Sequence, residues 1–363
     1  MTYFQEYVSN TTAGTSNQSL FAGGEGVSRV FYRLLWGGTE HYSLLFSNTL
    51  DSTFADGTRS CANQLCGPWT LSVSCCVCQG PEDPGLESGV WTDVTFDGAR
   101  EKTASPGELF STDAFPLTVR DGEYLCVQIR YRGDRIPCHP EINIPSYRKQ
   151  ADRFVLCEDV PVPSMVGCRR DVKMRIGFLG DSITQGIGTA LDSYGHWCHS
   201  VMKRLGPGYA GWNLGIGYGR ASDAASQGIW LEKALQNDCV VVCFGINDIV
   251  QGDGDKLSEN LERLVDVLKN RGKKVILQSI PPFDFVDQQA RDLWEAHNHY
   301  IRHVLAPKCD GYLDVATFLS VGGAGQTTKY GGHPNEEGCA VWAEHLLPVL
   351  RDVLGIRLPQ EGS

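Results

Sequence analysis

Four short segments of the chain carry side chains or clustered glycines of the kinds that catalysts use. In chain order they are Gly180-Asp181-Ser182, the glycine-rich run 213–220, Gly245-Ile246-Asn247-Asp248 and Gly332-His333-Pro334-Asn335. Alone, each is weak evidence, because Gly-Asp-Ser usually forms a turn and His-Pro-Asn usually starts a helix. Their joint occurrence in this order, each at the end of a predicted strand or in a loop, indicates one site.

Ser182 and His333 have the side chains of a nucleophile and its general base. A serine hydroxyl attacks a carbonyl poorly until a base removes its proton, and a neutral imidazole does this near pH 7. The imidazole then returns the proton to the leaving alcohol. The tetrahedral intermediate carries an oxyanion, and loss of one preplaced donor to it costs about 3 kcal/mol. We expect three donors: the Ser182 N–H at the start of a helix, the Asn247 amide and a backbone N–H of 213–220.

From residue 172 onward, apolar runs alternate with segments of helical periodicity. In 257–271, for example, Leu257, Leu261 and Leu264 share one face, and Gly272 can cap the end. Such alternation predicts a parallel sheet with helices on both faces, and ligands bind at the carboxyl ends of its strands. The predicted strands are 174–180, 211–217, 239–245, 274–280 and 311–316, and the predicted helices include 257–271, 287–306 and 336–354.

The first part of the chain has a different pattern. Runs rich in aromatic and β-branched residues, such as WTLSVSCCVC and YLCVQIRYR, are separated by Gly, Asp, Asn and Pro. A β-sandwich of jelly-roll type is the natural closed arrangement. With a linker at 161–171, the 363 residues divide into an all-β domain at 1–165 and an α/β domain at 166–363.

The four segments resemble the four blocks of the SGNH (GDSL-like) hydrolase superfamily, over about residues 172–357. The resemblance implies a flavodoxin-like three-layer domain in which Ser182 is the nucleophile and His333 the base. It implies Asn247 and a second-block glycine as oxyanion donors, and neither a cofactor nor a metal. The domain order and the run from Ser182 to Gly188 resemble carbohydrate esterase family two, whose members remove acetyl groups from plant polysaccharides. We therefore expect an acetylesterase acting on small or oligosaccharide esters.

The chain departs from the family pattern at two positions. Tyr218 stands where the family has the donor glycine, so Gly219 is the favoured backbone donor and Tyr218 the second choice. Tyr330 stands where the family has an aspartate, three residues before the histidine. We therefore expect a Ser–His dyad whose imidazole is oriented by a backbone carbonyl. A remote carboxylate, Asp310 or Asp314, is the alternative third member.

The composition of the chain limits which binding partners and which cellular compartment we expect. A formal net charge of −11 argues against binding to nucleic acid or an anionic membrane, since both need clustered Lys and Arg. The start of the chain lacks the features of a secretory signal, and no apolar run is long enough to span a membrane, so we expect a cytoplasmic protein. The fourteen cysteines, including the cluster Cys75-Cys76-Cys78, are expected to be reduced small hydrophobes rather than zinc ligands or disulfides.

Other functions stay open at this stage. One is a lipase or lysophospholipase of the same superfamily, which would need an apolar acyl groove or lid. Another is a carbohydrate-binding protein whose esterase site is weak or lost. The β-rich domain could itself bind sugars through exposed aromatic residues, or serve oligomerisation. The acyl chain, the sugar and the state of assembly, including a homo-oligomer, are not determined by these patterns.

Overall fold

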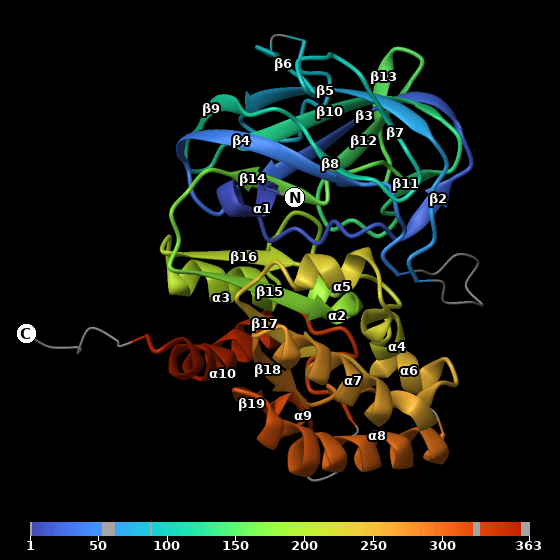
Figure 1. Ribbon diagram of the computed structural model, residues 1–363, viewed down its shortest axis with the longest axis vertical. Coiled ribbons are helices and arrows are strands. Elements are labelled where there is room, and N and C mark those ends of the chain that lie inside the picture. The colour runs from blue at the N-terminus through green and yellow to red at the C-terminus, as the bar shows by residue number, and fades with distance from the viewer. Residues whose placement is uncertain (1, 53–61, 88, 286, 322–326, 357–363) are drawn as a thin grey trace, which may run out of the picture.

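The computed structural model describes residues 2–52, 62–87, 89–285, 287–321 and 327–356. A β-rich half made by the first part of the chain stacks on an α/β half made by the second (Figure 1). None of the described helices is long and apolar enough to cross a membrane.

The N-terminal half consists of antiparallel sheets, as the all-β pattern predicts. Side chains from the two larger sheets, such as Tyr32 and Phe46, share one buried core. The jelly-roll connectivity and the domain boundary at 165 stay predictions. The five-stranded sheet has the order β1 (Val8–Ser9), β14 (Met165–Cys168), β4 (Gly38–Ser47) and β8 (Leu109–Ser111), with β9 (Phe115–Val119) on β4. The seven-stranded sheet has the order β13 (Arg153–Leu156), β12 (Ser146–Gln150), β3 (Gly24–Arg33), β10 (Tyr124–Gly133), β5 (Trp69–Cys78) and β6 (Thr92–Val94), with β7 (Lys102–Ala104) on β5, and a two-stranded sheet pairs β11 (Ile136–Cys138) with β2 (Ser19–Phe21).

The cysteine cluster lies in β5, where neighbouring residues point to opposite faces. Cys75 is buried in the core shared by the two large sheets. Cys76 packs on the other face against Phe31 and Cys126. The described cysteines have free thiols, and their burial is that of small hydrophobic side chains.

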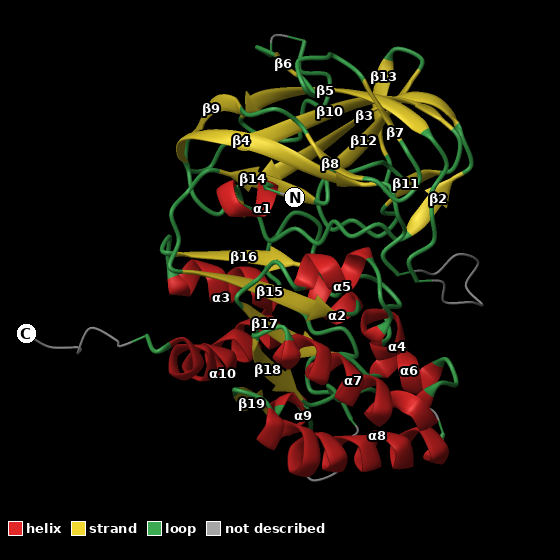
Figure 2. Cartoon of the chain, in the orientation of Figure 1, coloured by secondary structure: helices red, strands yellow, loops and turns green. Residues whose placement is uncertain are grey.

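The C-terminal half contains a five-stranded parallel sheet with helices on both faces (Figure 2). Phe178 packs edge-on against Trp197 of α3 at a ring distance of 5.3 Å. The neighbouring Gly177 lies against Asn237, just beyond α5. Because successive strand residues point to opposite faces, α3 and α5 lie on opposite sides of the sheet. The strand order is β16 (Tyr209–Asn213), β15 (Met174–Gly180), β17 (Cys239–Cys243), β18 (Lys274–Gln278) and β19 (Gly311–Leu313).

The helices lie where the sequence periodicity predicts them, and the differences are at the ends of elements. The helix predicted at 336–354 is α10 (Glu336–Leu354), and Trp342 within it stacks on Trp197 at 5.0 Å. The strand predicted at 311–316 ends at Leu313, because α9 (Val315–Leu319) starts directly afterwards. The remaining helices are α1 (Tyr3–Glu6), α2 (Ser182–Gln185), α3 (Trp197–Leu205), α4 (Ala221–Ala225), α5 (Ile229–Ala234), α6 (Ile246–Val250), α7 (Leu257–Asn270) and α8 (Gln288–Tyr300), which continues into a π-helical turn at Ile301–Leu305.

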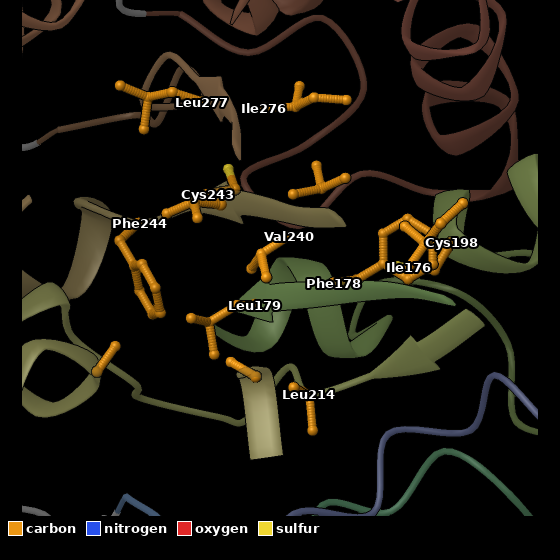
Figure 3. Close-up of a cluster of buried hydrophobic side chains, with 14 of the residues drawn as sticks. Ile176, Phe178, Leu179, Cys198, Leu214, Val240, Cys243, Phe244, Ile276 and Leu277 are labelled. Atoms are coloured by element: carbon orange, nitrogen blue, oxygen red, sulfur yellow. The ribbon is translucent and has the colours of Figure 1, made fainter. Parts of the chain in front are cut away.

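The parallel sheet has a continuous apolar core. Ile176, Phe178 and Leu179 of β15 and Val240 of β17 are fully buried among it (Figure 3). Burial on both faces is typical of parallel strands, which read as unbroken apolar runs. This core holds the ends of β15 and β17, and therefore the segments that follow them, in fixed positions.

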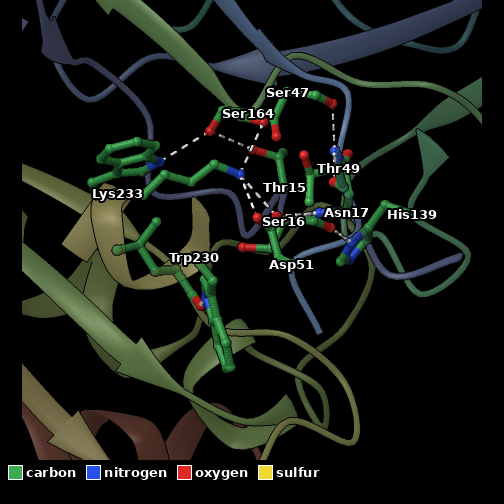
Figure 4. Close-up of polar contacts among 12 residues, drawn as sticks. Thr15, Ser16, Asn17, Ser47, Thr49, Asp51, His139, Ser164, Trp230 and Lys233 are labelled. Atoms are coloured by element: carbon green, nitrogen blue, oxygen red, sulfur yellow. Dashed lines mark hydrogen bonds and ion pairs between the residues drawn. The ribbon is translucent and has the colours of Figure 1, made fainter. Parts of the chain in front are cut away.

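A buried polar contact joins the two halves. The Lys233 ammonium of α5 lies 2.8 Å from both carboxylate oxygens of Asp51 in the N-terminal half (Figure 4). The same ammonium lies 3.3 Å from the Ser164 hydroxyl, and the Asn17 N–H donates to Asp51 at 2.7 Å. Both charged side chains are almost fully enclosed, with 1% of Lys233 and 0% of Asp51 exposed.

Candidate active site

The structure brings Ser182 and His333 together. The Ser182 hydroxyl oxygen lies 2.9 Å from Nε2 of His333, although 151 positions separate the two residues. Ser182 follows the end of β15, and His333 lies in the turn that precedes α10. The serine is half-buried and the histidine exposed, so the pair opens to solvent.

The turn that carries Ser182 is held by backbone hydrogen bonds. Asp181 caps it, with its carboxylate accepting from the Ile183 N–H at 3.0 Å. Gly186, at φ 115°, ends the helix after one turn. The helix that starts at Ser182 is thus only one turn long. A helix this short has a small dipole, so its field at the Ser182 N–H is weaker than we expect from the sequence.

Two buried carboxyl groups flank the site. Burial raises the pKa of Asp181 to about 7, with the charge of Asp248 adding to the effect. Burial likewise raises the pKa of Asp248 to about 7. Asp248 accepts from the Ala221 N–H at 3.1 Å, so it ties α6 to α4. Both groups therefore hold backbone in place.

The candidate third members of a triad are engaged elsewhere. Asp310 accepts from the Lys269 ammonium at 2.6 Å and from the Val275 N–H at 2.7 Å. Asp314 pairs with Arg302. In the part of the chain that the structure describes, the hydrogen bond found at the His333 ring is the one to Ser182. A dyad oriented by a backbone carbonyl stays a prediction.

Asn247 contacts the 213–220 run, so the two expected sources of oxyanion donors lie side by side. The Asn247 amide donates one hydrogen to the Gly219 carbonyl at 3.0 Å, which orients the second hydrogen of the same nitrogen. The Gly219 N–H donates to the Ile216 carbonyl at 3.1 Å and is thus engaged within its own turn. Tyr218 adopts φ 60°, a conformation that glycine takes freely, at the position where the family has glycine. Gly219 as an oxyanion donor stays a prediction.

The model of the GDSL-like lipase/acylhydrolase family matches residues 178–341. This segment resembles that family, and we call the C-terminal half the GDSL-like domain. The match includes Ser182, Asn247 and His333, and it confirms the resemblance inferred from the four segments. The family that this segment matches consists of lipases and acylhydrolases, which supports ester hydrolysis as the chemistry of the site.

Several solved structures are similar to this chain at low sequence identity. A putative lipolytic protein of the G-D-S-L family from Desulfitobacterium hafniense is 18% identical, with a TM-score of 0.40, over 48% of this chain and 98% of its own. The acetylxylan esterase Axe2 from Geobacillus stearothermophilus is 20% identical, with a TM-score of 0.41, over 53% and 99%. A family two carbohydrate esterase from Cellvibrio japonicus is 12% identical, with a TM-score of 0.41, over 96% and 95%. No curated protein sequence matches the chain.

The N-terminal half contributes residues that the sequence patterns did not single out. His139, Glu141 and Asn143 hydrogen-bond to the loop that follows the Ser182 turn of the GDSL-like domain. They come from an irregular segment after β11, where no periodicity marks which side chains face inward. The nearby polar residues His139 and Glu141 were a local signal that this segment could contact another part of the chain.

We expect the activity of the GDSL-like domain to depend on pH through His333. Although part of His333 is exposed, the protein packed around its ring partly removes water from it, which disfavours the charged imidazolium and lowers the pKa of His333 below 6.5. The neutral base therefore persists to lower pH, and kcat/KM should rise with pH to a plateau, with its midpoint below 6.5. A pH profile of ester hydrolysis measures this. A midpoint near 7 would instead point to ionisation of Asp181 or Asp248.

Proposed function

We propose that the protein is a serine esterase that releases small acyl groups, acetyl foremost, from carbohydrate esters through an acyl-enzyme on Ser182. The observation that supports this most is the 2.9 Å contact between the Ser182 hydroxyl and His333 Nε2, at a solvent-open position within a GDSL-like domain.

In this mechanism, His333 Nε2 takes the Ser182 proton as the serine oxygen bonds to the ester carbonyl carbon. The carbonyl oxygen becomes an oxyanion, stabilised by the Ser182 N–H, the Asn247 amide and, as third donor, a backbone N–H of the 213–220 run, for which Gly219 would have to release its bond to the Ile216 carbonyl. The imidazolium then gives its proton to the leaving alcohol as the C–O bond breaks. Water attacks the acyl-serine by the same steps, releasing the acid and free Ser182.

The packing of the glycine run supports a small acyl group. A Cβ added at Gly215 would lie 2.2 Å from the Gln185 nitrogen, and one at Gly217 would lie 1.9 Å from the Glu141 carboxylate. Backbone and polar side chains therefore pack directly against Gly215 and Gly217. A long acyl chain would need an apolar groove, and the nearest neighbours of Gly215 and Gly217 are backbone or polar side chains, whereas Gly219 packs against Ile216 and Trp230. The sugar part of the proposal comes from the resemblance of Ser182–Gly188 and of the domain order to carbohydrate esterase family two.

The acyl preference provides the direct test. With p-nitrophenyl esters, kcat/KM should fall roughly tenfold from acetate to butyrate and further to octanoate, because a small site penalises each added methylene. Acetate release from acetylated oligosaccharides should exceed fatty-acid release from triglycerides. Background hydrolysis is subtracted with the Ser182→Ala variant. A preference for octanoate would favour the lipase alternative, and no release from acetylated sugars would remove the carbohydrate assignment.

A further inference from the structure

We infer that the segment 139–143 of the N-terminal half is a positioning element of the active site, because it holds the loop 185–189 that touches both Ser182 and His333. The inference rests on the proposed function. It assigns the N-terminal half a part in building the catalytic geometry of the other half.

The loop 185–189 contacts both members of the pair. It begins at the last residue of α2, three positions after Ser182, and the N–H groups of Gly186 and Ile187 donate to the Ser182 carbonyl at 3.0 Å. At its other end, Gly188 adopts φ 103°, and an added Cβ would lie 2.6 Å from the His333 carbonyl oxygen. A displacement of this loop therefore changes the distance between the serine hydroxyl and the imidazole.

One amide of the N-terminal half ties the two ends of the loop together. The Asn143 side chain donates to the Gly186 carbonyl at 3.1 Å and to the Thr189 hydroxyl at 2.9 Å, with the Thr189 carbonyl at 3.5 Å. The Thr189 hydroxyl in turn donates to the Gly186 carbonyl at 2.8 Å. The loop is thus closed on itself through a side chain from outside the GDSL-like domain.

A second contact holds the start of the loop. Nδ1 of the buried His139 faces the Ser16 carbonyl, so Nδ1 carries the hydrogen (Figure 4). Nε2 is then an acceptor for the Gln185 amide, at 2.8 Å. The same Gln185 nitrogen donates to the Glu141 carbonyl at 2.6 Å. Burial lowers the pKa of His139 to about 4, so this neutral tautomer persists across the working range of pH.

Catalysis should respond to this contact more strongly than folding does. A single hydrogen bond contributes little net stability, because the unfolded chain makes the same bonds with water. A displacement of about 1 Å at a reacting group can lower the rate about 100-fold, because the attacking geometry is lost. A positioning role therefore predicts a fall in kcat larger than the loss of stability alone would give.

The test uses Asn143→Asp in the full chain. Aspartate has the same shape, but its carboxylate accepts and cannot donate to the Gly186 carbonyl. We expect kcat on p-nitrophenyl acetate to fall about 10- to 100-fold, with KM within about twofold of the wild type. The rate at which a small phosphonate ester labels Ser182 should fall in the same proportion. Should Asn143→Asp not fold, Thr189→Val removes the hydroxyl acceptor at nearly constant shape, and its kcat should fall at least threefold.

Asn48→Asp is the matched control. The Asn48 amide donates to the Gly67 carbonyl at 3.0 Å and the Ser105 carbonyl at 2.8 Å, entirely within the N-terminal half. It should lower the melting temperature and leave kcat unchanged. Full activity of Asn143→Asp beside an inactive Ser182→Ala would overturn this inference alone. An equal kcat loss in Asn48→Asp would also overturn it, and a wild type without Ser182-dependent hydrolysis would overturn the proposed function as well.

Discussion

The Ser182→Ala variant should lose on the order of 10⁴-fold or more in kcat and still fold as the wild type does. Without the hydroxyl there is no acyl-enzyme, and the residual rate comes from the remaining binding and oxyanion groups. The side chain is small and half-buried, and its hydroxyl contacts His333, so its loss leaves no large cavity. Steady-state kinetics with p-nitrophenyl acetate, beside a thermal melt, measures both quantities.

A second serine–histidine pair provides the control. Ser258 hydrogen-bonds His297 Nδ1 at 2.7 Å, between α7 and α8 and outside the four sequence segments. Ser258→Ala breaks a contact of the same chemistry and should keep full activity. The double variant Ser182→Ala/His333→Ala should be no slower than Ser182→Ala, because the two residues act as a unit. Substantial activity in Ser182→Ala would remove this serine from the mechanism.

Lys233→Met should destabilise the protein by about 3–5 kcal/mol, the usual cost of leaving one member of a buried ion pair alone. The Asp51 carboxylate would lose an ammonium that lies 2.8 Å from both its oxygens. It would keep the Asn17 N–H, which does not neutralise a buried charge. Denaturant unfolding measures the change, provided that the slope of the transition stays constant.

Two further variants separate the buried charge from the loss of a side chain. Adding Asp51→Asn to Lys233→Met removes the uncompensated charge and keeps an acceptor for Asn17, so most of the lost stability should return. Arg132→Met breaks the exposed pair with Glu101, where both partners are more than half accessible, and should change stability very little. A Lys233→Met variant as stable as Arg132→Met would show that this pair does not hold the halves together.

Local patterns were enough to predict most of the α/β scaffold and to propose the residues of the site. The apolar run of β17 and the leucine spacing of α7 are local signals of a buried strand and an amphipathic helix. Parallel strands place their carboxyl ends at one edge of a sheet, so residues following β15 and β17 had to meet there. That rule brought Ser182 and Asn247 to the same edge without any knowledge of the distances.

The geometry of the turns was harder to predict from the sequence. Tyr218 was recognised as standing in a glycine position, but its left-handed backbone and the bond from Gly219 to Ile216 depend on how the whole run packs. The helix after Ser182 was expected to supply a dipole, yet Gly186 ends it after one turn. A glycine permits such an ending without requiring it, so the sequence left both outcomes possible.

The sequence by itself determined which side chains are candidates for the chemistry, their order, and the sheet edge where they gather, because these follow from residue type and from local periodicity. Tertiary structure alone decided that Asn143 and His139 brace the loop beside Ser182, and that Lys233 meets Asp51 across 182 positions of chain. Each of these contacts involves an irregular segment of the N-terminal half, where no period marks the inward side. Their partners are chosen only when the two cores pack, so no local pattern records them.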